Sequence, residues 1–201
     1  MRKRITAITV GICLAAVAFL SLTAFSCFGF GVEDKVFTTE GVSITLNSGF
    51  KKESIKAEDL ESDDPVTQGT IFKYRDSKSG MLVVGAKVAK SEMAKFNAFD
   101  LPGFAKVVRE LYSENKKIEY VEEPTYYATF AFTYDDGYNM SLIQYEACYE
   151  DPNFFYEVSF SLEKSDYDGG MKADVEKYAA SLVTTDGIGK FDGVTDKDFE
   201  Y

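Results

Sequence analysis

Apolar and polar residues alternate in several stretches of the chain, which is the pattern of half-buried β-strands. Residues 42–46, with the sequence VSITL, alternate in this way directly after Glu40 and Gly41, where a turn is expected. Two further alternating stretches flank residues 76–80, DSKSG, whose composition is typical of a turn. The segment 70–90 therefore predicts a β-hairpin.

A three-strand meander is predicted within residues 118–163, where aromatic and β-branched residues alternate with polar ones. We expect Asp136 and Gly137 to form a two-residue type I′ turn between its first two strands. Such a turn fixes the register, and it would pair Phe130 with Ile143. In that register one face of both strands is uniformly apolar, which favours the pairing.

The connection to the third strand of the meander contains Pro152, which cannot take the positive φ of a type I′ turn. A four-residue loop, 151–154, is therefore predicted, and it pairs Tyr156 with Tyr149. The strand that precedes the meander is expected to end at Pro124, because proline cannot donate a hydrogen bond to a neighbouring strand.

Helical periodicity is found in two segments. Residues 101–114 follow Asp100, which is a favoured N-cap residue, and predict an amphipathic helix. The apolar stripe of this helix consists of Phe104, Val107, Val108 and Leu111. Residues 168–183 predict a closing helix. Its apolar stripe consists of Met171, Val175, Tyr178, Ala179 and Leu182.

These elements predict an α+β fold, with an antiparallel sheet made of the hairpin and the meander and with helices flanking it. We expect one globular domain at residues 36–185, which is long enough to bury a core of its own. Residues 27–35 are expected to be a tether. Residues 186–201 are rich in glycine and aspartate and are expected to form an acidic, flexible tail.

The chain begins with a basic stretch, RKR at residues 2–4, and residues 5–25 then carry no charge. This layout is typical of a signal peptide, and the apolar run is also long enough to span a bilayer as a helix. Residues 1–26 are therefore expected to be a signal peptide or a membrane anchor. Either one places the domain outside the cytoplasm, at the cell membrane.

Cys27 follows Ala24, Phe25 and Ser26, an order similar to that of a bacterial lipobox. Ser26 is acceptable before the cysteine, whereas Phe25 stands where a small residue is usual. Three possibilities stay open: lipidation of Cys27, an uncleaved anchor, and ordinary cleavage after Ala24.

Composition excludes several kinds of chemistry. The chain has no histidine and therefore no Ser-His-Asp triad, no Cys-His dyad and no His-ligated zinc. Without the three N-terminal basic residues, 19 basic residues stand against 33 acidic ones, a net charge of −14. Such a charge repels nucleic acid. The acidic residues do not follow the spacing of a calcium-binding EF-hand loop, so neither a metal nor a cofactor is expected.

Two phrases mark the ends of the predicted domain: VSITLNSGF at residues 42–50 and YAASLVTTD at residues 178–186. With the order of the elements between them, they resemble the PsbP-like, Mog-type domains. Phe50 stands where tryptophan is common in that family, the usual proline is missing, and Ser181 matches the closing serine. The resemblance implies an α/β/α sandwich and, for many bacterial members, a lipoprotein. It points to no functional residue.

Cys148 is the only cysteine of the predicted domain, so it has no partner for an intrachain disulfide there. A nucleophilic thiolate needs a positive neighbour, a helix N-terminus or a metal. The predicted register instead places Glu157 opposite Cys148, and Glu146 precedes it by two residues on the same face. We therefore expect an inert thiol.

Four polar residues are predicted on the face of the meander opposite the aromatic core: Tyr127, Gln144, Glu146 and Glu157. Each unpaired polar group would cost about 1–3 kcal/mol if it were buried. We therefore expect this part of the face to lie at least partly open to solvent. A tyrosine beside acids suits a basic partner, so these four are the candidate partner-binding residues.

The expected function is a non-enzymatic binding or scaffold module held at the outer face of the cytoplasmic membrane. Two other functions stay open: a ligand-binding lipoprotein associated with a transporter, and a carboxylate-dependent hydrolase. The expected partners are the membrane, through lipid or an N-terminal helix, and an unknown protein or small molecule.

Overall fold

The computed structural model describes residues 33–113, 119–126, 129–135, 141–166 and 169–184, with the side chains of residues 33–111, 142–166 and 170–184. All of them belong to the unit Glu33–Tyr201. The strands are β1 (Asp34–Thr39), β2 (Val42–Asn47), β3 (Phe50–Lys52), β4 (Thr70–Asp76), β5 (Leu82–Ala89), β6 (Glu119–Tyr126), β7 (Thr129–Asp135), β8 (Ser141–Glu150), β9 (Phe154–Glu163) and β10 (Val183–Thr184). The helices are η1 (Ala57–Leu60), α2 (Pro65–Gln68), α3 (Lys90–Met93), η2 (Ala94–Phe96), α4 (Leu101–Ser113), η3 (Lys164–Asp166) and α5 (Gly169–Ala180).

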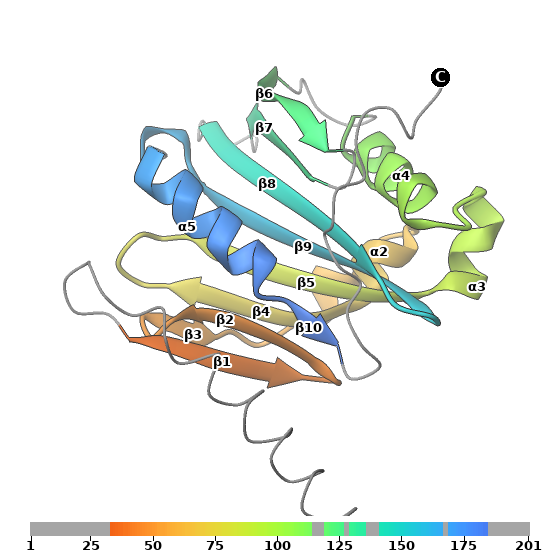
Figure 1. The fold of residues 1–201 in the computed structure, drawn as a ribbon, viewed down its shortest axis with the longest axis horizontal. Helices are drawn as coiled ribbons and strands as arrows, with labels where there is room; N and C mark the ends of the chain where they lie inside the picture. Colours follow the sequence, from red (N-terminus) through yellow and green to blue (C-terminus); the bar gives the residue numbers. More distant parts are fainter. Residues whose placement is uncertain (1–32, 114–118, 127–128, 136–140, 167–168, 185–201) are drawn as a thin grey trace, which may run out of the picture. The chain divides into compact units, whose positions relative to one another are not determined.

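The strands form two antiparallel sheets, one with the order β1-β2-β10 and one with the order β3-β4-β5-β9-β8-β7-β6. The small sheet and α5 pack on one face of the large sheet, and α2, α3 and α4 pack on the other (Figure 1). The α+β class and the sandwich architecture are thus confirmed. The separate small sheet is a difference from the expected single sheet. It arises because the apolar face of β2 packs onto the large sheet instead of pairing with its edge.

The hairpin predicted at residues 70–90 is present as β4 and β5, and the turn expected at Glu40 and Gly41 is present as well. Glu40 and Gly41 join β1 to β2 with φ angles of 49° and 79°. Two consecutive positive φ angles are the signature of a type I′ turn. In β2 the alternate residues Val42, Ile44 and Leu46 are buried, as their spacing predicts.

The register between β8 and β9 is confirmed: Tyr149 pairs with Tyr156, and Cys148 pairs with Glu157. The connection between these strands also follows the prediction. The amide of Asp151 donates to the carbonyl of Phe154 over 3.0 Å, and Pro152 lies within the loop that this bond closes. Because Pro152 excludes a type I′ turn, the register between β8 and β9 could be derived from the sequence.

The predicted register between β7 and β8 is wrong. Phe130 pairs with Glu146 instead of Ile143, and Ile143 pairs with Thr133. Because the shift is an odd number of residues, it moves every residue of β7 to the face opposite the predicted one. The last pair of the ladder, Asp135 with Ser141, leaves five residues between the strands instead of two. A longer connection does not fix the register in the way that a type I′ turn does.

Strand β6 also differs from the prediction, because it continues through Pro124 to Tyr126. The strand lies at the edge of the large sheet, and its register with β7 shifts between Glu122 and Tyr126. An edge strand needs hydrogen bonds on one side only, so it tolerates proline at an irregular position.

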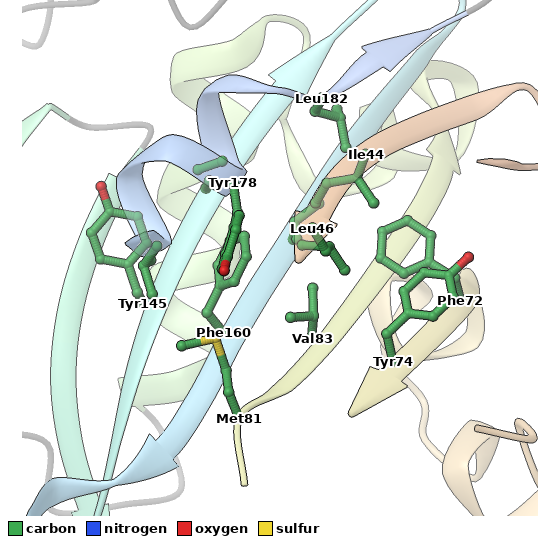
Figure 2. Close-up of a cluster of buried hydrophobic side chains, with 14 of the residues drawn as sticks. Ile44, Leu46, Phe72, Tyr74, Met81, Val83, Tyr145, Phe160, Tyr178 and Leu182 are labelled. Carbon is green, nitrogen blue, oxygen red and sulfur yellow. The ribbon is translucent and has the colours of Figure 1, made fainter. Parts of the chain in front are cut away.

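The larger core lies between the large sheet and the layer of β2 and α5. Figure 2 shows Leu46 directed at Val83, with the rings of Phe72 and Tyr74 beside them. The predicted stripe of α5 faces this core: Val175, Tyr178, Ala179 and Leu182 are buried, and Met171 is partly buried. Phe50, at the position where tryptophan is common in the PsbP-like domains that the sequence resembles, packs edge-on against Tyr178 with ring centroids 5.8 Å apart.

Ser181, the residue shared with the closing phrase of that family, joins two elements that are distant in the sequence. Its hydroxyl accepts a hydrogen bond from the amide of Thr45 in β2 over 2.9 Å and donates to the carbonyl of Tyr178 over 2.7 Å. The serine therefore ties the end of α5 to the small sheet, which is a structural role.

The second core lies under α4. Asp100 caps this helix, since the amide of Gly103 donates to its Oδ1 over 2.9 Å. Phe104 and Val108 from the predicted stripe are fully buried, and Val107 and Leu111 are partly buried. The ring of Phe104 stacks on that of Phe155 in β9, with centroids 4.8 Å apart and planes 5° apart. Helix α4 is thereby fixed to the face of the large sheet that lies opposite β2 and α5, which is called the outer face.

Two buried aspartates hold the turns of the large sheet. Asp76 accepts hydrogen bonds from the amides of Lys78 and Ser79 and from the Ser79 hydroxyl. Asp151 accepts from the amides of Asn153 and Phe154 and from the Tyr156 hydroxyl. Burial by itself would raise the pKa of each carboxyl, but these hydrogen bonds outweigh it and lower both pKa values below the ordinary 3.8.

These two carboxylates should make the fold sensitive to acid. A pKa lowered by folding contributes stability that is present above pH 3.8 and is lost as the pH falls through the lower folded-state value. Urea unfolding midpoints measured from pH 7 to pH 2 should therefore decline more gently for Asp151→Asn than for the wild type. Asp63→Asn, at an exposed position outside these turns, is the control. A decline as steep in Asp151→Asn as in the wild type would contradict the assignment.

Candidate functional site

The candidate site predicted from the sequence lies on the outer face of β8 and β9. In the observed register Cys148 pairs with Glu157, and Glu146 pairs with Ser159. Residues that pair directly across two strands share a face, and alternate residues along a strand do so as well. Gln144, Glu146 and Glu157 are therefore brought together as predicted. Tyr127 lies outside the described residues.

The expectation that this face lies open to solvent is wrong. Gln144, Glu146 and Glu157 are 5%, 0% and 3% exposed. The Gln144 amide Nε2 donates to Glu146 Oε1, and the Ser161 hydroxyl donates to Gln144 Oε1 over 3.0 Å. Polar groups can be buried when they have such partners, because the hydrogen bonds offset the cost of desolvation.

Helix α4 explains part of this burial. Cys148 lies on the same face and packs in one apolar cluster with Phe104, Ala105 and Val108 of the helix. The sequence predicted both the helix and the polar strand positions, but not that the helix would lie on this face. A contact between this face and a basic partner would require the covering elements to move.

Cys148 is a free thiol, fully buried, as expected from the absence of a partner in the domain. Burial raises the pKa of the thiol well above its ordinary value, and the carboxylates of Glu157 and Glu146 raise it further. The thiolate is the reactive form of cysteine, so this environment disfavours nucleophilic chemistry.

Cys148 should accordingly react slowly with iodoacetamide in the native protein at neutral pH and rapidly in 8 M urea. Mass spectrometry of the peptide containing residue 148 would measure both rates. A Cys148→Ala variant should retain whatever binding the protein shows. Native alkylation as fast as that of the unfolded chain would contradict the burial of the thiol.

Buried carboxylates could serve hydrolysis if a substrate reached them. Glycoside hydrolases use two carboxylates that flank the scissile bond in an accessible cleft. Glu146 and Glu157 are diagonal neighbours on adjacent strands, but neither is exposed in this conformation. Among the described residues, no group of three histidine, cysteine, aspartate or glutamate side chains is placed to hold a metal ion.

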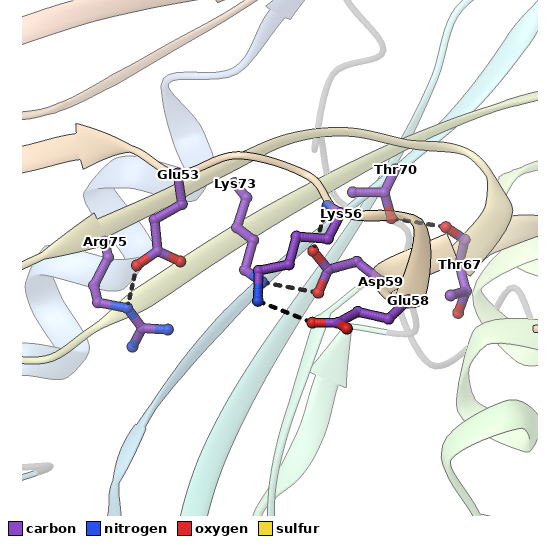
Figure 3. A network of polar contacts seen from close by, with 8 residues as sticks. All are labelled: Glu53, Lys56, Glu58, Asp59, Thr67, Thr70, Lys73 and Arg75. Atoms are coloured by element: carbon purple, nitrogen blue, oxygen red, sulfur yellow. Dashed lines mark hydrogen bonds and ion pairs between the residues drawn. The ribbon is translucent and has the colours of Figure 1, made fainter. Parts of the chain in front are cut away.

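A second polar cluster lies along β4 and is drawn in Figure 3. Arg75 Nε contacts Glu53 Oε1 at 2.6 Å, and Lys73 Nζ contacts Asp59 Oδ1 at 3.0 Å. A backbone hydrogen bond from Lys56, followed by the bond from Lys73, lowers the pKa of Asp59. Each of these acids lies beyond β3 in the chain and is paired with a base on β4. The cluster therefore fastens the η1 segment to the sheet, and such partly exposed ion pairs contribute about 0–1 kcal/mol each.

The most exposed aromatic side chains that the structure describes lie at the end of η2 and in the turn that follows it, before α4. Phe96 is 44% exposed and Phe99 is 69% exposed. Residues 96–99, FNAF, are called the 96–99 turn below. The signal in the sequence was that neither ring fits the apolar stripe of the following helix. The two exposed rings lie three residues apart in the chain, and exposed apolar side chains that gather in one place mark contact sites.

Buried neighbours and a backbone hydrogen bond hold the 96–99 turn in place. Ala98 and Met93 are fully buried in the core under α4, and the Ala98 amide donates to the Met93 carbonyl over 3.2 Å. Asn97 adopts φ of 60°, a left-handed conformation that asparagine tolerates better than most residues. Asp100 then caps α4. The two rings are therefore presented on a backbone fixed at both ends.

Cys27, the predicted lipidation site, lies outside the described residues. Within the described part of the chain, no helix combines the length and the apolar character needed to cross a bilayer.

No family model matches the chain, and no curated protein matches it. Among solved structures, the chain is similar to a protein from Bacteroides thetaiotaomicron VPI-5482, with 13% identity and a TM-score of 0.41. That match covers 72% of this chain and 45% of the Bacteroides chain, so the present chain spans less than half of that protein's length.

Two further structures match over nearly their whole length. The Ran-binding protein Mog1p of Saccharomyces cerevisiae is 10% identical with a TM-score of 0.46, covering 78% of this chain and 97% of Mog1p. The cyanobacterial PsbP protein (CyanoP) of Synechocystis sp. PCC 6803 is 13% identical with a TM-score of 0.40, covering 80% of this chain and 98% of CyanoP. The expected resemblance to PsbP-like, Mog-type domains is confirmed, and it carries no argument about function.

Proposed function

We propose that the protein is a non-enzymatic binding or scaffold module held at the outer face of the cytoplasmic membrane by its N-terminal segment. The observation that carries the proposal is the 96–99 turn, which presents two apolar rings to solvent on a fixed backbone. An exposed, preorganised apolar surface is what a contact site needs, because little conformational entropy is lost when it binds.

Two properties of the chain support this proposal. The uncharged run at residues 5–25, preceded by three basic residues, is typical of a membrane-targeting segment. Three side chains that could act in catalysis lie buried inside the fold: Cys148, Glu146 and Glu157. Glu146 is hydrogen-bonded there. This burial favours a function in which the surface of the domain binds a partner over one in which these side chains catalyse a reaction.

The attachment is tested by fractionation of cells that express the full chain. The protein should sediment with membranes, and radiolabelled palmitate should enter the wild type but not Cys27→Ser. Cys148→Ser, which removes the buried thiol, is the matched control and should keep the label. Membrane retention without any label would indicate an uncleaved helix in place of a lipid. Recovery of the wild type in the soluble fraction would overturn the proposal.

A further inference from the structure

We propose that the 96–99 turn is a second membrane contact, in which the rings of Phe96 and Phe99 enter the lipid–water interface in addition to the N-terminal attachment. The inference rests on the proposed function, since it requires that the N-terminal segment hold the chain at the bilayer. The partner of the turn is then the lipid surface, and the domain has a fixed orientation relative to the bilayer.

The chemistry of the turn suits an interface. The exposed fraction is 69% for Phe99 and 44% for Phe96. Transfer of these rings from water to the boundary between headgroups and acyl chains has a favourable free energy. Lys95 directly precedes Phe96, and its long side chain can keep its charge in the headgroup region while the ring lies deeper. Because Met93 and Ala98 anchor the backbone next to the rings, little conformational entropy of the backbone is lost on insertion.

The local charge also favours this site over the rest of the surface. Residues 89–103 contain two basic and two acidic side chains, and Glu150 adds a third acid, so this patch has a net charge of −1; the chain without Arg2, Lys3 and Arg4 has a net charge of −14. Near the rings, Lys95 pairs with Glu92, and Lys90 Nζ lies 2.6 Å from Glu150 Oε2. A weakly charged patch with apolar rings can approach anionic headgroups that repel a strongly acidic surface.

The length of the tether makes the contact reachable. Six residues, 28–33, separate Cys27 from the start of β1 at Asp34, and the seven steps from Cα to Cα span at most about 25 Å. The domain is thus kept close to the bilayer, which raises the effective concentration of the rings there. In Figure 1, β1 begins on the left of the unit and α3 lies on the right. Attachment at both places would lay the domain along the membrane.

The chain has no tryptophan, so Phe99→Trp introduces a single fluorescent reporter. The full-length variant is reconstituted into phosphatidylcholine vesicles with and without brominated acyl chains, which quench only tryptophans that touch the lipid. We expect Trp emission at position 99 to shift to the blue and to fall about twofold or more with brominated lipid. Val183→Trp, at an exposed site in the small sheet, is the control and should be unaffected.

Adding Phe96→Ser to the Phe99→Trp variant should weaken the quenching, because one of the two rings is lost. Flotation of the same vesicles separates the two proposals. Failure of every variant to float would overturn the N-terminal attachment, whereas flotation without quenching at position 99 would overturn only the contact of the turn. Equal quenching at positions 99 and 183 would also overturn it. In native membranes, cross-linking of a photoreactive residue at position 99 to one protein would assign the turn to a protein partner instead.

Discussion

Replacing Phe104 with alanine is expected to lower the free energy of unfolding by about 3–5 kcal/mol, as found for large aromatic residues removed from well-packed cores. Phe104 is fully buried and stacks on Phe155 at a centroid distance of 4.8 Å. The ring is a main link between α4 and the outer face of the large sheet. Its loss leaves a cavity at that junction and also weakens the cover over Cys148.

Urea unfolding, followed by circular dichroism, measures the stability of the Phe104→Ala variant, and alkylation of Cys148 measures the local opening. Both the unfolding midpoint and the protection of the thiol should fall. Val107→Ala changes a partly buried residue of the same helix and should cost clearly less. A loss below about 1 kcal/mol for Phe104→Ala would show that the helix is held by other contacts.

Gly85→Ala is expected to destabilise the fold by about 1–3 kcal/mol, although the change adds only one methyl group. Gly85 pairs with Phe72 across β4 and β5, and the ring lies over the glycine. A Cβ atom at position 85 would come within 2.0 Å of Phe72 Cζ and within 2.5 Å of two further ring atoms. The ring is 2% exposed and packs against Tyr74 at a centroid distance of 5.2 Å, so it has little room to move.

The cause can be isolated with a second substitution. Leucine at position 72 lacks the distal ring atoms that would clash, so Phe72→Leu should reduce the cost of Gly85→Ala. In a double-mutant cycle measured by urea unfolding, the double variant should lose less unfolding free energy than the sum of the two single variants, by about 0.5–3 kcal/mol. Gly80→Ala is the control, because a Cβ there meets no atom within 4 Å and any cost comes from the φ of 74°. Strict additivity of the two changes would contradict the steric explanation.

Much of the local structure could be predicted from the sequence because its signals act over a few residues. The alternation of VSITL predicted β2, and Asp100 with the stripe that includes Phe104 predicted α4. Pro152 excluded a type I′ turn, and the β8–β9 register followed from that exclusion. The same register placed Glu157 opposite Cys148, so the environment of the thiol was predictable as well.

The register of β7 could not be derived in the same way. Asp136 and Gly137 form a strong short-range turn signal, but the ladder between β7 and β8 leaves five residues in the connection. A turn motif indicates where a chain can reverse, and the packing of the neighbouring strands decides where the pairing begins. Pairing of β5 with β9, which joins the hairpin to the meander, likewise depends on residues far apart in the chain.

For the candidate site, too, some features followed from the sequence and others depended on the tertiary structure. The sequence by itself determined which residues share the outer face of β8 and β9, because side chains alternate along a strand with a period of two. It also determined the acidic charge and the absence of histidine chemistry. Only the tertiary structure decided that α4 packs on that outer face, that Glu146 is buried, and that Phe99 remains in solvent. Burial depends on which distant element packs over a face, and the local pattern of residues carries no information about that partner.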